Sequence, residues 1–226
     1  MKRSQINAAI RFAIELAESH RFALPPLAHW TPADWAKRGA EYDEIRRARL
    51  GWDVTDFGQG RFDRLGLTLL TIRNGVPGMP RSKPYCEKLL FVRPGQVTPL
   101  HFHWHKTEDI INRGGGRLVC EVHASSADER PDSAPLSILC DGHRRQVASG
   151  GLIVLGPGES ITLTPRVYHS FWADPAGGAV LVGEVSSVND DQRDNRFLDP
   201  LGRFPTIDED ELPGWLLCSE YPAGAG

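Results

Sequence analysis

The first residues of the chain repeat their apolar positions with the period of an α-helix. Between residues 4 and 20 one apolar stripe recurs every three or four positions, formed by Ile6, Ile10, Ala13, Ile14 and Ala17. Ser4 precedes the stripe, where its hydroxyl can cap the first turn. We therefore predict a helix over 4–20 that uses this stripe for packing.

A second helix start follows a proline-containing link. Thr31, Pro32 and Asp34 combine a capping hydroxyl, a proline in the first turn and an early carboxylate, all of which favour a helix N-terminus. This helix is predicted to end near Gly39 or to resume through Ala48. We expect residues 1–50 to form a helical extension that packs on the outside of a β-barrel.

From Gly51 onward the pattern changes to a period of two, which is typical of β-strands. Asp141-Gly142 separates two short segments and predicts a hairpin turn. Many short strands divided by glycine and proline turns indicate a sandwich or a small barrel. Strands are predicted in and beside the segment 95–115 and at 66–75, 85–93, 117–123, 136–140, 152–155, 160–164, 168–172 and 179–186.

The last forty residues lack both periods and are rich in Asp, Arg and Pro. They predict an irregular arm over 188–226, with a short strand or helix near 215–218. We expect one domain in residues 1–226, with the barrel in residues 51–187.

Composition excludes several classes of protein. The net charge of −3 with mixed signs argues against nucleic-acid binding, and no apolar run approaches the ~18 residues that a membrane span needs. The N-terminus begins with basic residues, but charged residues interrupt its apolar run, so no signal peptide is expected. The four cysteines lie far apart without a Cys-x-x-Cys pair, which favours reduced thiols in a cytoplasmic protein.

The segment from Gly95 to Gly115 carries the main candidate chemistry. His101, His103 and His105 alternate, and residues two apart in a strand share one face. The four residues between His103 and Glu108 suffice for a tight turn that returns the carboxylate to the same point. Two imidazoles and a carboxylate suit a divalent transition metal. Packed or surface histidines, or a histidine pH switch, are the other interpretations.

His169 adds a fourth candidate ligand. It follows a proline turn far downstream and completes a set of three histidines and one carboxylate with His101, His103 and Glu108. A pair formed by His103 and His105 would leave only two residues for the turn before Glu108. His105 is therefore expected to support a ligand or to face the substrate.

These residues form a recognisable motif. The pattern Gly-x5-His-x-His-x4-Glu-x6-Gly, which resembles the first motif of the cupin superfamily, spans 95–115, and a block with proline and histidine follows at 165–169. The phrases HFHWHKTEDIINRGGG, GESITLTPRVYHSFWA and LVGEVSSVNDD look like the D-lyxose isomerase family of sugar isomerases. The resemblance extends over nearly the whole chain.

The resemblance implies a cupin jelly-roll β-barrel whose mouth holds a metal. It implies interconversion of D-lyxose and D-xylulose, with a side activity between D-mannose and D-fructose, and a homodimer as the assembly. Four protein ligands on an octahedral Mn²⁺ leave two positions for a sugar, whereas they would close a tetrahedral Zn²⁺. We therefore expect Mn²⁺, with other divalent ions such as Co²⁺ as alternatives.

Isomerisation moves a hydrogen between C1 and C2 of an open-chain sugar. In one route a general base removes the C2 proton, a cis-enediol forms beside the metal, and the proton returns to C1. The other route is a hydride shift that needs no carbon base. Glu184 is the first candidate for the base, because it lies on an apolar strand face where burial is expected to raise its pKa. A salt-bridged structural Glu184 is the alternative.

Further polar residues are candidates for holding the sugar. Lys106, in the turn before Glu108, can polarise a carbonyl or hold a hydroxyl, although exposed turn lysines are common. Lys88 lies in a strand, where charge is unusual. Other candidates for the mouth are Asp190, Asp191 and Arg193, which also fit a solvated charge run. Apolar walls or core packing are the two interpretations for Trp104, Phe171 and Trp172.

Two other functions stay open at this point. One is another cupin metalloenzyme, such as an oxygenase or an epimerase, and the other is a non-catalytic sugar-binding cupin. The sequence shows no helix-turn-helix, which argues against a complete DNA-binding regulator. Turnover of a free pentose would separate these classes.

Overall fold

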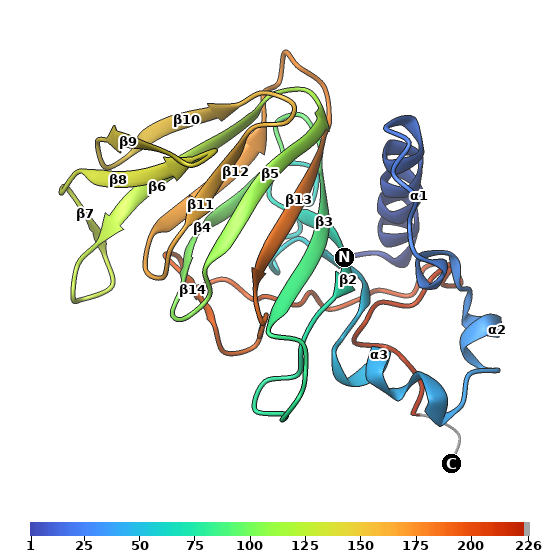
Figure 1. Cartoon of the computed structure of the whole chain (residues 1–226). Helices are drawn as coiled ribbons and strands as arrows, with labels where there is room; N and C mark the ends of the chain where they lie inside the picture. The colour runs from blue at the N-terminus through green and yellow to red at the C-terminus, as the bar shows by residue number, and fades with distance from the viewer. Residues whose placement is uncertain (224–226) are drawn as a thin grey trace.

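The computed structural model describes residues 1–223 and shows a mainly β protein with one long helix beside the sheets (Figure 1). The helices are α1 (Arg3–Ser19), α2 (Pro32–Trp35) and α3 (Asp43–Arg47), with two 3₁₀ turns at Pro26–His29 and Ala40–Tyr42. The strands are β1 (Gly51–Thr55), β2 (Leu67–Arg73), β3 (Tyr85–Val92), β4 (Val97–His103), β5 (Glu108–Gly115), β6 (Leu118–Ser125), β7 (Pro131–Asp132), β8 (Leu136–Cys140), β9 (His143–Val147), β10 (Gly151–Leu155), β11 (Ser160–Leu163), β12 (Tyr168–Ala173), β13 (Val180–Ser187) and β14 (Asn195–Phe197).

The strands form two antiparallel sheets that curl toward each other (Figure 1). The larger sheet has the order β1-β2-β3-β13-β5-β11-β8-β9, and the smaller one has the order β10-β6-β12-β4-β14. Apolar side chains from both sheets fill the space between them, since alternate residues of each strand point inward. The core between the sheets includes Leu90, Ile110, Val122, Ile161, Phe171 and Val182.

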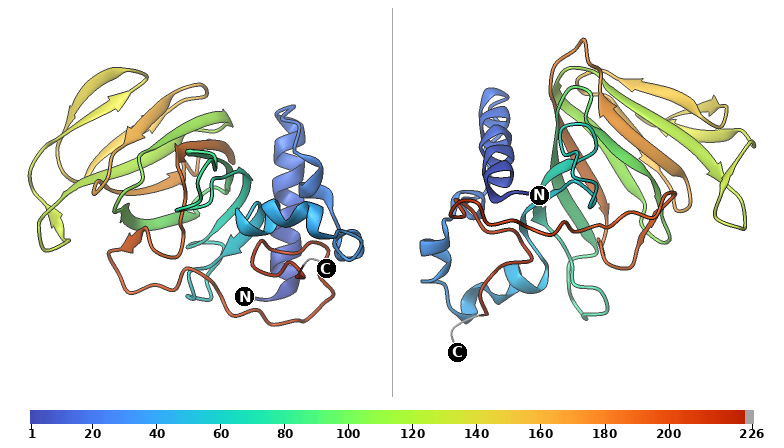
Figure 2. Two further views of the ribbon diagram at one scale, coloured as in Figure 1. Left: turned by 60° about the horizontal axis from the view of Figure 1, so that its bottom comes forward. Right: turned by 180° about the vertical axis from the view of Figure 1, so that it is seen from behind.

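Helix α1 packs on the outer face of the larger sheet, as expected for the N-terminal helices. The apolar stripe of α1 is fully buried except at the partly buried Ile14, and it packs against a second apolar cluster that contains Leu70, Phe91 and Leu181. Figures 1 and 2 show the helix standing beside β2, β3 and β13, away from the smaller sheet. None of the helices between residues 1 and 223 has the length and apolar character that crossing a bilayer requires.

Some local predictions hold and others are wrong. Thr31 caps α2 by accepting a hydrogen bond from the backbone of Asp34, as predicted. Asp141 and Gly142, with φ values of 48° and 77°, form the two-residue turn between β8 and β9. Ser4 does not cap α1, because the N-cap is Lys2 and the Ser4 hydroxyl donates to Asp210.

The second helix ends at Trp35, before Gly39, and helix resumes in α3, which agrees with the predicted resumption through Ala48. One further element prediction is wrong. No helix or multi-residue strand forms over 215–218, where Leu217 makes only an isolated bridge to Trp52. The missed strand β14 pairs with β4, the strand of two of the predicted metal ligands.

The C-terminal arm (residues 188–223) connects the barrel to the N-terminus (Figure 2). Its first part forms β14 along the edge of β4. Its last part returns to α1, where Lys2 bridges to Asp208 and the Arg3 side chain binds Glu209 and Glu220. The arm therefore contacts both the candidate site and the helix outside the barrel.

Candidate metal centre and active site

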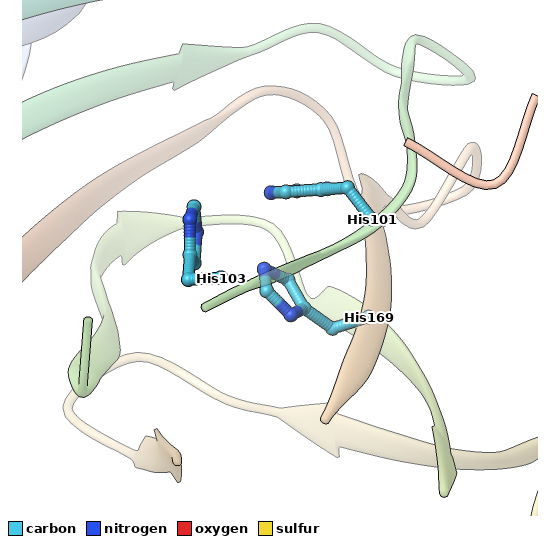
Figure 3. Close-up of side chains that lie close together, drawn as sticks. All are labelled: His101, His103 and His169. Atoms are coloured by element: carbon cyan, nitrogen blue, oxygen red, sulfur yellow. The ribbon is translucent and has the colours of Figure 1, made fainter. Parts of the chain in front are cut away.

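Two neighbouring strands of the smaller sheet bring three histidines together. His101 and His103 lie two residues apart on β4 and share its inward face, and His169 on β12 pairs in register with His101. One ring nitrogen of each lies within 4.8 Å of the others, and all three side chains are buried. Figure 3 shows the three rings turned toward one another.

Backbone carbonyls fix the orientation of each ring. The Nδ1 atom of His101 lies 2.7 Å from the oxygen of Pro99, and that of His169 lies 3.0 Å from the oxygen of Val167. The Nδ1 atom of His103 lies 2.9 Å from the oxygen of Asp194. A carbonyl oxygen only accepts, so each Nδ1 must carry the proton. In the neutral ring each Nε2 then offers a lone pair, which is the state a metal ligand needs.

Glu108 completes the cluster from the start of β5. Its Oε1 lies 3.0 Å from His169 Nε2 and 3.4 Å from His103 Nε2. Burial alone raises the pKa of Glu108, but the adjacent ammonium group of Lys106 and the contacts with His103 and His169 together outweigh burial, so the pKa is held well below its usual range. Glu108 is therefore an ionised carboxylate beside the imidazoles.

The donor set fits a divalent metal. Burial lowers the pKa of His101 and of His103, so both rings are neutral at neutral pH. The Nε2 atom of His169 is buried and has no hydrogen-bond partner, although Glu108 Oε1 is only 3.0 Å away. Two acceptor atoms that face each other at this distance are stabilised by a cation between them. Three imidazole nitrogens and one carboxylate suit first-row ions that accept N and O ligands.

A chain of alternating charges leads away from the histidines. Lys106 Nζ lies 2.7 Å from Glu108 and 2.9 Å from Glu184, and Lys88 Nζ lies 3.2 Å from Glu184. Lys88 and Glu184 are direct neighbours across β3 and β13. All four side chains are buried. The two ammonium groups thus hold the Glu184 carboxylate next to the histidine cluster.

The expected protonation of Glu184 is corrected by these contacts. Burial does raise the pKa of this carboxyl, but Lys106 and Lys88 outweigh burial, and the resulting pKa is below the usual value. Burial lowers the pKa of Lys106 as well, yet its two carboxylate neighbours raise it above the usual range. Glu184 is consequently a carboxylate at neutral pH, and Lys106 is a charged ammonium group rather than an exposed turn lysine.

These residues line a cavity of about 40 Å³ inside the barrel mouth. The C-terminal arm and the loop after β1 cover it through Phe57, Asp191, Phe197 and Arg203. Four buried side-chain atoms within residues 1–223 have no hydrogen-bond partner, and three of them belong to residues lining this cavity. They are Thr98 Oγ1, His169 Nε2 and Arg203 Nη1.

The remaining predicted residues fall into two groups. Lys88 and Asp191 line the cavity, as does Phe171. His105, Asp190 and Arg193 instead line a neighbouring cavity of about 540 Å³ between the β2–β3 loop and the arm. The structure does not bring these three residues to the histidines, and their role as substrate ligands stays a prediction. Trp104 packs edge-on against Phe102, and Trp172 does not line the cavity.

Sequence reasoning named Asp191 of the arm but missed Arg203 and Asp194. Arg203 donates to Asp53 at 2.6 Å and lies 3.7 Å from Asp191. Asp194 is buried and accepts from the backbone of His105 and of Lys106. Neither lies in a periodic segment, so the pattern along the chain held no signal for them. A buried charge can be recognised only from the folded arm.

Comparisons with known proteins identify the family of the chain. A model of the family described as D-lyxose isomerase matches residues 1–221. The D-lyxose/D-mannose isomerases of Serratia proteamaculans and Escherichia coli O157:H7 are each 49% identical to this chain over 223 residues, and each alignment covers 98% of both proteins.

A solved structure shows the same fold. The L-ribose isomerase of Geodermatophilus obscurus superposes with a TM-score of 0.60 over 92% of this chain and 98% of its own, at 17% identity. At this identity the likeness shows the fold alone, and the expected cupin-type barrel is confirmed. Because the family model and the two relatives match over nearly the full length of the chain, the chain belongs to the D-lyxose isomerase family.

Proposed function

We propose that this protein is a metal-dependent aldose–ketose isomerase that interconverts D-lyxose and D-xylulose, and also D-mannose and D-fructose. Membership of the family and the names of its relatives support the substrates. The observation that carries the chemistry is the ionised Glu184 carboxylate, which two buried lysines hold beside three histidines and Glu108. A base next to a metal-binding cluster is what proton transfer between C1 and C2 requires.

Each group has a role that follows from its surroundings. His101, His103, Glu108 and His169 would hold the metal, and the bound ion would supply Lewis acidity to the sugar oxygens. Glu184 removes the C2 proton and donates a proton to C1, with a cis-enediol between the two steps, while the hydroxyl proton of O2 passes to O1. Its carboxylate is already ionised, so it can accept the proton at neutral pH.

Lys106 and the cavity wall serve the sugar itself. The Lys106 ammonium group, charged and fixed between Glu108 and Glu184, stabilises negative charge on the sugar oxygens as the proton leaves. The free polar atoms of Thr98 and Arg203 are matched by sugar hydroxyls, which donate and accept hydrogen bonds. Lys88 keeps Glu184 ionised and in place.

We further propose Mn²⁺ as the metal, with Co²⁺ as an alternative, because four ligands on an octahedral ion leave two positions for the substrate. We propose a homodimer, supported by the exposed Leu152 and Val154 on β10, an edge strand of the smaller sheet. A cytoplasmic location is supported by four cysteines that all remain free thiols.

The decisive experiment measures ketose formation from D-lyxose and D-mannose by metal-stripped protein, with and without Mn²⁺. The Glu184→Gln variant keeps the size of the side chain and is expected to lower kcat by roughly 10²–10⁴-fold, because it removes the base. Reaction in D₂O identifies proton transfer by solvent deuterium at C1 of the ketose, which enters when the proton held by Glu184 exchanges with the solvent, whereas a hydride shift brings none.

The outcomes distinguish the proposal from its alternatives. Metal-dependent xylulose formation with solvent deuterium, lost in Glu184→Gln, supports the scheme. If Glu184→Gln stays active and its ketose product carries no solvent deuterium, the reaction proceeds by a hydride shift and needs no base. If neither sugar yields ketose with any metal, the isomerase proposal fails, and oxygen uptake or simple sugar binding becomes the function to measure.

A further inference from the structure

The three histidines are not held in place in the same way. His101 and His169 each bond through Nδ1 to the carbonyl two residues earlier on their own segment, Pro99 and Val167. The partner of His103 is the carbonyl of Asp194, 91 residues away on the C-terminal arm. The Nδ1 atoms of two rings are thus held by the barrel itself, whereas the Nδ1 atom of the third is held by the docked arm.

Asp194 also helps to dock the arm here, next to the pairing of β14 with β4. Its Oδ1 accepts from the backbone N–H of His105 at 2.8 Å, and its Oδ2 accepts from the backbone N–H of Lys106 at 3.0 Å. The side chain is buried, so these bonds form away from water, where leaving the two donors unpaired would be costly. Asp194 therefore binds the turn between β4 and β5 through both carboxylate oxygens.

We propose that Asp194 is a positioning residue that couples docking of the C-terminal arm to metal binding and to the placement of Lys106. Its carboxylate fixes the backbone of the turn and thereby the start of the Lys106 side chain. With the carboxylate held, its own carbonyl is brought to His103 Nδ1. The proton on Nδ1 then leaves the Nε2 lone pair directed at the cluster.

The coupling must act in both directions, because a ligand that favours the docked arm is in turn favoured by it. A metal bound by His103 stabilises the docked arm, and loss of docking weakens metal binding. The inference rests on the metal centre of the proposed function. This centre is assembled from two histidines that the barrel orients and a third, His103, whose orientation depends on the arm.

Mn²⁺ binding to the metal-stripped full-length protein tests the coupling directly. The loss of the Mn²⁺ electron paramagnetic resonance signal on binding gives the dissociation constant. Asp194→Ala is expected to raise it by roughly 10–100-fold, as removal of groups that orient metal ligands does. Asp194→Asn keeps one acceptor oxygen and should show a smaller rise. Asp199→Ala removes an exposed carboxylate of the same arm and should leave the constant unchanged.

Trypsin provides the reciprocal measurement. Arg193 and Arg196 flank Asp194, so tryptic cleavage there reports how firmly the arm is docked. Mn²⁺ should slow this cleavage in the wild type and in Asp199→Ala, and should do so much less in Asp194→Ala. At saturating Mn²⁺ the Asp194→Ala variant should keep a kcat lowered roughly tenfold or more, with a smaller change in KM, because Lys106 is misplaced.

The possible results are distinct. Asp194→Ala could melt at a lower temperature but bind Mn²⁺ with wild-type affinity and gain full protection from trypsin. That result would show a merely structural role and overturn the inference. If the wild type binds no Mn²⁺, Co²⁺ or other divalent ion, the metal centre of the proposed function fails, and this inference fails with it. A wild type that binds metal, with Asp194→Ala equal to it, refutes the coupling alone.

Discussion

Arg3 and Arg203 are both buried guanidinium groups bound to carboxylates, but the chain satisfies them to different extents. Every side-chain nitrogen of Arg3 has a partner, since Nε and Nη2 bind Glu209 and Nη1 binds Glu220. Arg203 uses Nη2 for Asp53, whereas its Nη1 is buried without a hydrogen-bond partner. The first group is complete in the folded chain, and the second is complete only with a ligand.

The same difference separates the two regions around these arginines. The terminal clasp, formed by Arg3, Ser4 and Asn7 of α1 with Glu209, Asp210, Glu211 and Glu220 of the arm, pairs each polar group with another. Among residues 1–223, the residues that line the histidine cavity instead carry most of the buried side-chain atoms that lack partners. Each such atom costs about 1–3 kcal/mol. Such a cost is expected where a substrate or a metal supplies the missing partner.

A substitution at Arg203 is the most direct test of this difference between the two arginines. Arg203→Lys keeps a positive charge for Asp53 but removes the unpaired Nη1 donor. If that donor binds a sugar hydroxyl, kcat/KM for D-lyxose should fall roughly 10–100-fold, the size expected for one hydrogen bond to a charged group. Steady-state kinetics at saturating Mn²⁺ measure this. Thermal melting should change little, and a variant with unchanged kcat/KM would remove Arg203 from the substrate site.

Arg3 should show the opposite behaviour. Arg3→Met fills a similar volume but removes the charge, so the free energy of unfolding is expected to fall by roughly 1–3 kcal/mol through lost bonds to carboxylates. For a chain of this size each kcal/mol lowers Tm by about 2–4 °C. Activity per folded molecule should stay at the wild-type level. A loss of kcat in the folded variant would show that the clasp also acts on the cavity through the arm.

Prediction from sequence succeeded where the determinants are local. The alternation of His101 and His103, and the turn length to Glu108, follow from strand geometry, and the structure brings these residues together with His169. The strand pattern likewise predicted most of both sheets, because each strand face alternates between core and exterior. Thr31 capped its helix because its partner lies only three residues away.

Prediction failed where a partner lies far along the chain. Ser4 looked like a cap but binds Asp210 across the clasp. The pKa of Glu184 was expected to rise, and it is lowered because Lys88, its neighbour on β3, and Lys106 approach it in the folded barrel. Asp194 had no visible pattern at all, since its role depends on the path of an irregular arm.

The smallest expected effect is the acid sensitivity of the terminal clasp. The hydrogen bonds from Arg3 lower the pKa of Glu209 below its ordinary value. A group whose folded pKa is lowered contributes stability above its unfolded pKa of about 4.3, and this contribution is lost as the pH falls through the folded pKa. Glu209 is more than half exposed, so water screens the pair and the contribution is small.

The difference in Tm between wild type and Arg3→Met should therefore be constant from pH 8 to about pH 5 and should narrow as the pH falls below about 4. Asp210, whose pKa the hydrogen bonds from Ser4 lower, titrates in the same direction, and Glu220 also faces Arg3. Glu209→Gln isolates the pair, because it removes one titrating group and keeps the arginine. If the difference in Tm between wild type and Arg3→Met stayed constant down to pH 3, Arg3 would stabilise the clasp through packing rather than through charge. The two arginines would then differ in how they pack and not in how their charges are paired.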